Sequence, residues 1–221
     1  MENKVTMDFK NSYTTSDLPN NFIQLRQLDK YLIGHKGYVA GGVFKNIFNK
    51  EKFKDVDIFF ERKEDWHEAN DYYKKNDEYV TAYSNNKVQA YRNTKTNVVV
   101  ELINFIYGKP EEVVSKFDFT VVKFAYYKEK VNENEGEVSN VEWKILYHNK
   151  FFEHLHLKRL VIDQEAMKID KPVNTLNRTY RYAKYGYFPC RETKVKIIDS
   201  LRLMPRFDDT ILSNELYNGF D

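Results

Sequence analysis

The chain has 221 residues and a formal net charge of +2, so its overall charge does not call for a nucleic-acid partner. Hydrophobic residues make up 42% of the sequence and aromatic residues 16%, which suits one large domain, or a domain with a small appendage, around an aromatic core. A single cysteine excludes an internal disulfide framework, and no apolar run suits a signal peptide or a membrane span, so we expect a soluble cytoplasmic protein.

The periodicity of apolar residues predicts alternating helices and strands in the first half of the chain. In chain order we expect an irregular polar lead-in (1–20), a helix (21–33), a strand that runs into a glycine turn (37–42), a helix (43–48), a strand (54–60) and a charged helix (61–79).

The second half predicts further strands and then helices. In chain order we expect a hairpin (88–105) with its turn at 93–97, a helix that begins near Pro110, a strand (117–127), an exposed polar loop (128–141), a strand (141–148) and helical structure from about residue 151. The predicted fold is therefore α+β, a small mixed or antiparallel sheet flanked by helices. A soft boundary near residue 150 separates a head domain (1–150) from a helical segment (151–221).

Two aspartates at the start of the predicted strand over 54–60 share one face, because residues i and i+2 of a strand project to the same side. Asp55 and Asp57 therefore repel each other unless a cation lies between them. Mg²⁺ takes oxygen ligands and leaves coordination positions open for phosphate oxygens. Gly41 and Gly42 precede the pair and allow the backbone N–H groups to approach a phosphate.

A third acid is expected on a neighbouring strand. Glu101 lies in the otherwise apolar "NVVVELINF", where an unpaired carboxylate would be costly. Asp118 in "FDFTVV" raises the same question, although an acid at a strand end that caps a turn or pairs with Lys116 explains it equally well. Taken singly, each of these motifs is common in turns and strand ends.

The combined pattern resembles the DNA polymerase β nucleotidyltransferase superfamily, and within it the head and neck of class II CCA-adding enzymes and bacterial poly(A) polymerases. Four segments carry the resemblance in the same order, namely "AGGVFKNIFNKEKFKDVDI", "VELINFI", "KFDFTVVKFAYY" and "NTLNRTYRYAKYGYF". The chain departs from the family at several positions. Lys45 and Asn46 stand where the family has Arg-Asp, and Lys116 and Phe117 replace the two arginines before Asp118.

The resemblance implies phosphoryl transfer assisted by two Mg²⁺ ions, with Asp55, Asp57 and Glu101 as catalytic residues and metal ligands. It also implies nucleotide contacts from residues of the glycine turn, the Asp-Phe-Thr segment and the neck-like helix, namely Gly41, Gly42, Lys45, Asp118, Arg178 and Arg181. The two arginines are three residues apart and so share one helix face, which also suits a solvated basic surface.

The implied function is transfer of NMP from an NTP to a hydroxyl, with an RNA 3′ end, as in tRNA processing, as the expected acceptor. No Glu-Asp-x-x-Arg segment follows, so CCA addition itself is not implied. Two alternatives stay open. One is a nucleotidyltransferase that modifies a protein or a small molecule, and the other is a non-catalytic nucleotide- or RNA-binding module. His154 and His156 are two residues apart, a spacing that does not favour a zinc site on one helix face.

Overall fold

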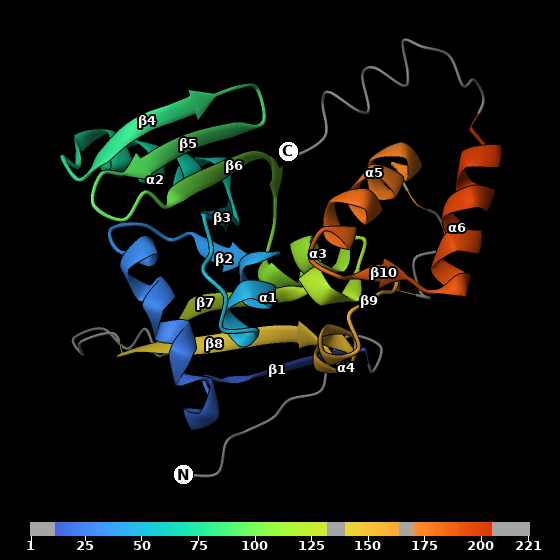
Figure 1. Ribbon diagram of the computed structural model, residues 1–221. Coiled ribbons are helices and arrows are strands. Elements are labelled where there is room, and N and C mark those ends of the chain that lie inside the picture. Colours follow the sequence, from blue (N-terminus) through green and yellow to red (C-terminus); the bar gives the residue numbers. More distant parts are fainter. Residues whose placement is uncertain (1–11, 132–139, 164–168, 170, 205–221) are drawn as a thin grey trace. The chain divides into compact units, whose positions relative to one another are not determined.

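The structure is a computed structural model that describes residues 12–131, 140–163, 169 and 171–204 (Figure 1). The chain divides into two compact units, and each is described by itself. The first comprises Met1–Phe117 with Val122–Asn149, and the second comprises Asp118–Val121 with Lys150–Asp221.

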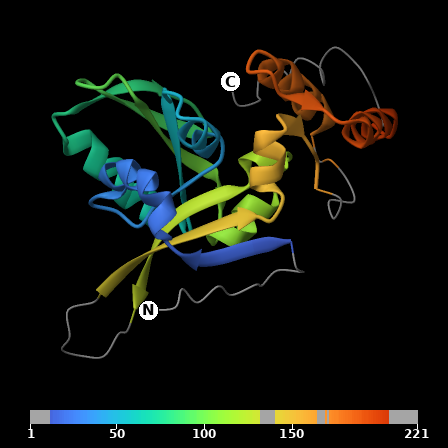
Figure 2. The same ribbon diagram turned by 60° about the horizontal axis from the view of Figure 1, so that its bottom comes forward.

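An eight-stranded sheet forms the centre of the first unit, in the order β1-β8-β7-β2-β3-β6-β5-β4. Its strands are β1 (Tyr13–Asp17), β2 (Tyr38–Ala40), β3 (Asp55–Phe60), β4 (Tyr79–Ser84), β5 (Val88–Asn93), β6 (Val99–Tyr107), β7 (Phe124–Val131) and β8 (Asn140–His148). Only the central pair β3 and β6 is parallel, and all other neighbours are antiparallel. The sheet is visible from a second direction in Figure 2.

Helices cover one face of this sheet. They are the 3₁₀ helix η1 (Asn20–Leu32), α1 (Val43–Phe48) and α2 (Lys63–Lys75). Helices α1 and α2 contact β3, whose even-numbered residues, such as Ile58, are fully buried, and η1 contacts β2. Aromatic contacts join the layers: Phe44 of α1 stacks on Phe124 with ring centroids 4.3 Å apart, and Tyr73 of α2 stacks on Tyr91.

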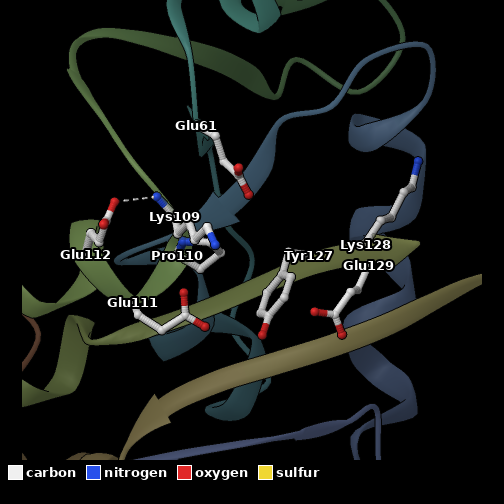
Figure 3. A pocket seen from close by; sticks show the side chains of 8 residues that line it. All are labelled: Glu61, Lys109, Pro110, Glu111, Glu112, Tyr127, Lys128 and Glu129. Atoms are coloured by element: carbon white, nitrogen blue, oxygen red, sulfur yellow. Dashed lines mark hydrogen bonds between the residues drawn. The ribbon is translucent and has the colours of Figure 1, made fainter. Parts of the chain in front are cut away.

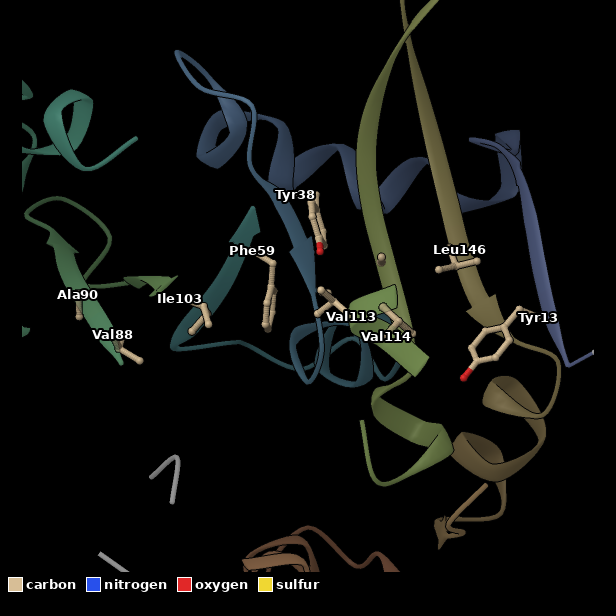
Figure 4. Packing of buried hydrophobic residues seen from close by; sticks show 11 residues of the cluster. Tyr13, Tyr38, Phe59, Val88, Ala90, Ile103, Val113, Val114 and Leu146 are labelled. Atoms are coloured by element: carbon tan, nitrogen blue, oxygen red, sulfur yellow. The ribbon is translucent and has the colours of Figure 1, made fainter. Parts of the chain in front are cut away.

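The opposite face, here called the acid face, carries Asp55, Asp57 and Phe59 of β3. Helix α3 (Pro110–Ser115) packs on part of this face through Val113 and Val114. Figure 4 shows these two valines against the core cluster of the same face, which includes Tyr13, Tyr38, Ala40, Phe59, Val88, Ala90, Ile103, Ala125 and Leu146. The apolar cluster thus occupies the face around the acids and fixes the strands that carry them.

The second unit is mainly helical. It contains α4 (Phe151–His156), β9 (Arg159–Leu160), α5 (Pro172–Ala183), β10 (Phe188–Pro189) and α6 (Arg191–Arg202), and η2 (Thr120–Val122) lies at the junction in sequence. The short strands β9 and β10 pair in parallel. In the described part of the chain, no helix has the length and hydrophobicity needed to span a membrane.

The α+β prediction is confirmed, and α1, the hairpin β5–β6 and α3 lie where the sequence placed them. The sheet is larger than predicted because its two edge strands were not recognised. The lead-in prediction is wrong for residues 13–17, which pair with β8. The helix predicted over 61–79 ends at Lys75, and β4 begins at Tyr79 and continues through residues for which no element was predicted. Both strands are only half covered, so they lack the continuous apolar pattern of the interior strands.

The strand predicted over 117–127 begins too early. Asp118 accepts a hydrogen bond from the Phe119 N–H at 2.8 Å, and the Thr120 N–H donates to the Val161 carbonyl at 2.9 Å. These bonds hold a turn before β7, which begins at Phe124. The strand then continues to Val131 through the start of the predicted loop, whose middle, residues 132–139, lies outside the described residues.

Candidate active site

The parallel pairing of β3 with β6 brings two of the predicted acids side by side. The register places Asp57 opposite Glu101 and Asp55 opposite Val99. The side chains of Asp57 and Glu101 are in hydrogen-bonding contact. Glu101 is only 8% exposed, so this contact is largely shielded from water. Two carboxylates in contact cannot both be ionised at low cost unless a cation lies between them; otherwise the pair retains a proton.

The electrostatics of Glu101 reflect this crowding. Burial raises the pKa of its carboxyl group above the usual range, and the charge of Asp55 raises it further. The hydrogen bond donated by Tyr83 and the hydrogen bond between the Asp57 and Glu101 side chains act in the opposite direction. The Tyr83 hydroxyl, which comes from edge strand β4, donates to Glu101 Oε1. Sequence reasoning missed Tyr83 because it did not recognise β4.

Gly41 lies directly beside this pair. A Cβ at position 41 would be 3.4 Å from Asp57 Oδ2, so the missing side chain leaves room next to the carboxylate. Its φ of +100° is in the region that glycine adopts without strain. Gly42 has ordinary helical angles and begins α1, so its backbone does not itself require glycine.

We expect Gly41→Ala to lower the free energy of unfolding by about 1 kcal/mol or more, because alanine is strained at this φ. Gly42→Ala serves as the matched control and should change it much less. Thermal unfolding of both variants against the wild type measures this, and 1 kcal/mol corresponds to roughly 2–4 °C for a chain of this size. Equal unfolding temperatures for the two variants would contradict the assigned strain.

The two carboxylates of the candidate site suit a divalent cation, although they do not form a complete metal site by themselves. Among the described residues, no group of three His, Cys, Asp or Glu is arranged to hold a metal ion. Mg²⁺, however, is commonly held by one or two carboxylates, with water and substrate phosphates completing its shell. Asp57 and Glu101 supply such a pair of hard oxygen ligands, next to a glycine that leaves space for a phosphate.

Lys45 is the last of the six predicted site residues in the first unit. It is 5% exposed, and its Nζ lies 3.6 Å from Glu51 Oε2. Its charge is therefore engaged inside the first unit, beside the end of α1. Whether it also contacts a nucleotide stays a prediction.

The remaining predicted nucleotide-binding residues belong to the second unit. Arg178 pairs with Asp118 at 3.2 Å, and its guanidinium lies over the rings of Phe119 and Tyr182. The structure thus brings two predicted nucleotide contacts together as an ion pair with each other. Arg181 is half-buried one turn further along α5. His154 Nδ1 lies 2.7 Å from the Thr120 hydroxyl.

A separate cavity of about 570 Å³ lies elsewhere on the first unit (Figure 3). Its lining consists of Glu61, Lys109, Pro110, Glu111, Glu112, Tyr127, Lys128 and Glu129. Glu61 follows the end of β3, whereas Asp55 and Asp57 lie at the start of that strand. The cavity therefore contains none of the candidate site residues.

Comparison with solved structures supports the fold. Similar structures include a CCA-adding enzyme in complex with ATP (TM-score 0.59, 14% identity, covering 90% of this chain and 46% of that chain). They also include a tRNA nucleotidyltransferase complexed with a primer tRNA and an incoming ATP analog (TM-score 0.56, 16% identity, 88% and 55% covered). A third is the Thermotoga maritima CCA-adding enzyme complexed with tRNA (TM-score 0.55, 14% identity, 91% and 50% covered).

The structural similarity shows a nucleotidyltransferase fold, and this chain spans about half the length of the structures it resembles. A search of curated proteins found no match. A family model described as Gabija anti-defense 2 family protein matches residues 2–158, which is most of the chain and includes all three candidate acids. The chain therefore belongs to the Gabija anti-defense 2 family.

Proposed function

We propose that this protein is a metal-dependent nucleotidyltransferase that transfers NMP from an NTP to a hydroxyl acceptor, with release of pyrophosphate and of the hydroxyl proton. The observation that carries the proposal is the contact between Asp57 and Glu101 on adjacent parallel strands, with Gly41 against Asp57. Two acids held in contact on a rigid sheet cost stability, and a cation-binding role accounts for that cost.

In this proposal Asp55, Asp57 and Glu101 hold Mg²⁺, with two ions in the full complex. When bound, these ions would neutralise the triphosphate and activate the attacking hydroxyl. The glycine turn gives the triphosphate access to Asp57. The Glu101 carboxylate lies on the side of Asp57 away from Gly41, and we assign it to the acceptor hydroxyl. Arg178, Arg181, Lys45 and Asp118 remain proposed nucleotide contacts.

We propose an RNA 3′ end as the acceptor, which the tRNA-bound structures of similar fold support. Basic residues of the second unit agree with this. Helix α5 carries two arginines with Tyr180 and Tyr182 among them, and α6 carries Arg191, Lys194, Lys196 and Arg202. The family is described as Gabija anti-defense 2, and we propose a protein of the Gabija defence as the alternative acceptor.

A non-catalytic binding module is the second candidate. The ion pairs Arg178–Asp118 and Lys45–Glu51 favour it, because they engage inside the chain two cations that a triphosphate would otherwise attract. This candidate predicts nucleotide binding that is indifferent to Mg²⁺.

A thermal-shift titration separates the two candidates. For the enzyme we expect each productive NTP to raise the unfolding temperature by roughly 5 °C at saturation, only when Mg²⁺ is present. Asp55→Asn should abolish this shift, and Asp77→Asn, which changes an exposed acid after α2, should keep it. A shift that survives both EDTA and Asp55→Asn would favour the binding module.

A further inference from the structure

A row of four residues crosses the acid face over the strands β4, β5, β6 and β3. The register pairs Tyr83 with Ala90, Ala90 with Glu101, and Glu101 with Asp57. Gly41 lies beyond Asp57, so the row has a glycine turn at one end and a tyrosine hydroxyl at the other. Glu101 is thus held between Asp57 and Tyr83.

A bulge in the edge strand directs Tyr83 to this face. The register of β4 against β5 shifts between Thr81 and Tyr83, with Ala82 as the extra residue. In an uninterrupted ladder Tyr83 would lie opposite Gln89 and project to the helix-covered face. Bulges commonly redirect a side chain in this way next to functional sites.

Ala90 allows the tyrosine to reach its partner. Strands are about 4.8 Å apart, so the Tyr83 side chain must cross roughly 10 Å from β4 to β6. The residue between them is fully buried and has only a methyl group, as Figure 4 shows for the cluster that contains it. The hydroxyl then donates to Glu101 Oε1, and the tyrosine stays 42% exposed.

We propose that Tyr83 is a positioning residue of the nucleotidyl transfer, which holds the Glu101 carboxylate beside Asp57 in the orientation that receives the cation. This inference rests on the proposed function. A hydroxyl that donates to one carboxylate oxygen fixes the rotation of the carboxylate and leaves its other lone pairs for a metal ion. Partners of this kind typically change metal affinity or activity by about 10- to 100-fold when they are removed.

The first test measures metal binding directly, with Mn²⁺ as the probe and electron paramagnetic resonance as the readout on the full chain. Tyr83→Phe removes the hydroxyl and keeps the ring. Tyr79→Phe is the matched control, because Tyr79 lies in the same strand and its hydroxyl bonds to Asn93 instead. We expect Tyr83→Phe to weaken Mn²⁺ binding by about 10-fold or more, and Tyr79→Phe to leave it within a factor of about two of the wild type.

The second test uses no metal, and measures the bond itself. A double-mutant cycle of Tyr83→Phe with Glu101→Ala should show a coupling of about tenfold in the unfolding equilibrium constant, as expected for a hydrogen bond to a charged group. If this coupling is absent, the hydrogen bond is not formed in solution and the inference is overturned.

The outcomes separate the inference from the proposed function. If the wild type binds Mn²⁺ and transfers nucleotide, and Tyr83→Phe does both equally well, Tyr83 has no positioning role while the function stands. If the wild type neither binds Mn²⁺ nor transfers nucleotide, the proposed function fails and the positioning role fails with it. Mass spectrometry of the wild type after turnover adds one more outcome: a nucleotide adduct on Tyr83 would make it an acceptor, and would also overturn the inference.

Discussion

Replacing Asp57 with Asn is expected to lower the rate of nucleotidyl transfer by at least about 10³-fold, the scale on which a preorganised electrostatic group contributes to catalysis. Asp57 is the carboxylate that both Gly41 and Glu101 approach, so its charge lies at the centre of the site. The neutral amide keeps the shape of the side chain but supplies a much weaker ligand for a divalent cation.

The same substitution should stabilise the fold. Asn at position 57 leaves one acid in the contact instead of two, and its amide can donate a hydrogen bond to Glu101 without a shared proton or a cation, which we expect to contribute about 1 kcal/mol, or roughly 2–4 °C. Transfer assays and thermal unfolding in the absence of metal measure the two effects, with Asp77→Asn as the control acid. A variant that is less stable than the wild type would show that Asp57 has a structural role, and would contradict this account.

The second large effect is a loss of stability below neutral pH that originates at His35. Its Nδ1 accepts a hydrogen bond from the Gly37 N–H at 3.0 Å, so the proton is on Nε2, which lies 3.1 Å from the Tyr31 carbonyl. Burial among aromatic rings lowers the pKa of His35 from 6.5 to about 4. The histidine is therefore neutral in the folded state at pH 5, whereas it is protonated in the unfolded chain.

The direction in which stability changes with pH follows from the number of protons that each state binds. Between pH 6.5 and about 4 the unfolded state holds more protons than the folded state, so stability is full above this window and is lost as the pH falls through it. We expect a loss of about 2 kcal/mol between about pH 7 and about pH 5, rising to about 3 kcal/mol at the lower end.

Urea unfolding of the wild type and His35→Asn at several pH values measures this contribution. Asparagine can accept the Gly37 hydrogen bond through its side-chain oxygen but does not titrate. The free energy of unfolding of the variant should therefore change less with pH than that of the wild type. The difference between the two curves isolates His35 from Glu101, whose raised pKa acts in the opposite direction. If the free energies of unfolding of the wild type and His35→Asn fall in parallel as the pH is lowered, His35 is not the source of the acid instability.

The sequence was sufficient to place the acids of the candidate site on their strands. Alternation in β3 placed Asp55 and Asp57 on one face, and an acid within the apolar β6 identified Glu101. The positions of these acids depend on local periodicity, which a single sequence records. The parallel register that brings Asp57 to Glu101 is a non-local property, and it could only be expected from the resemblance.

The surroundings of the site could not be predicted in the same way. Tyr83 reaches Glu101 only because of a bulge in β4 and a small residue at position 90 in β5, and neither leaves a recognisable local pattern. The pairing of Asp118 with Arg178 joins residues 60 positions apart in the chain. Such contacts are set by packing, so the ion pair between these two residues could not be predicted from the sequence, and their contact with a nucleotide stays a prediction.

The most direct test of the central claim is transfer itself. The wild type would be incubated with Mg²⁺ and each α-phosphate-labelled NTP in turn, with total RNA in one series and with proteins of the Gabija system in another. We predict label in an acceptor for the wild type and Asp77→Asn, and none for Asp57→Asn or in EDTA. Absence of label from every acceptor, with the wild type indistinguishable from Asp57→Asn, would contradict the claim that this fold retains nucleotidyl transfer.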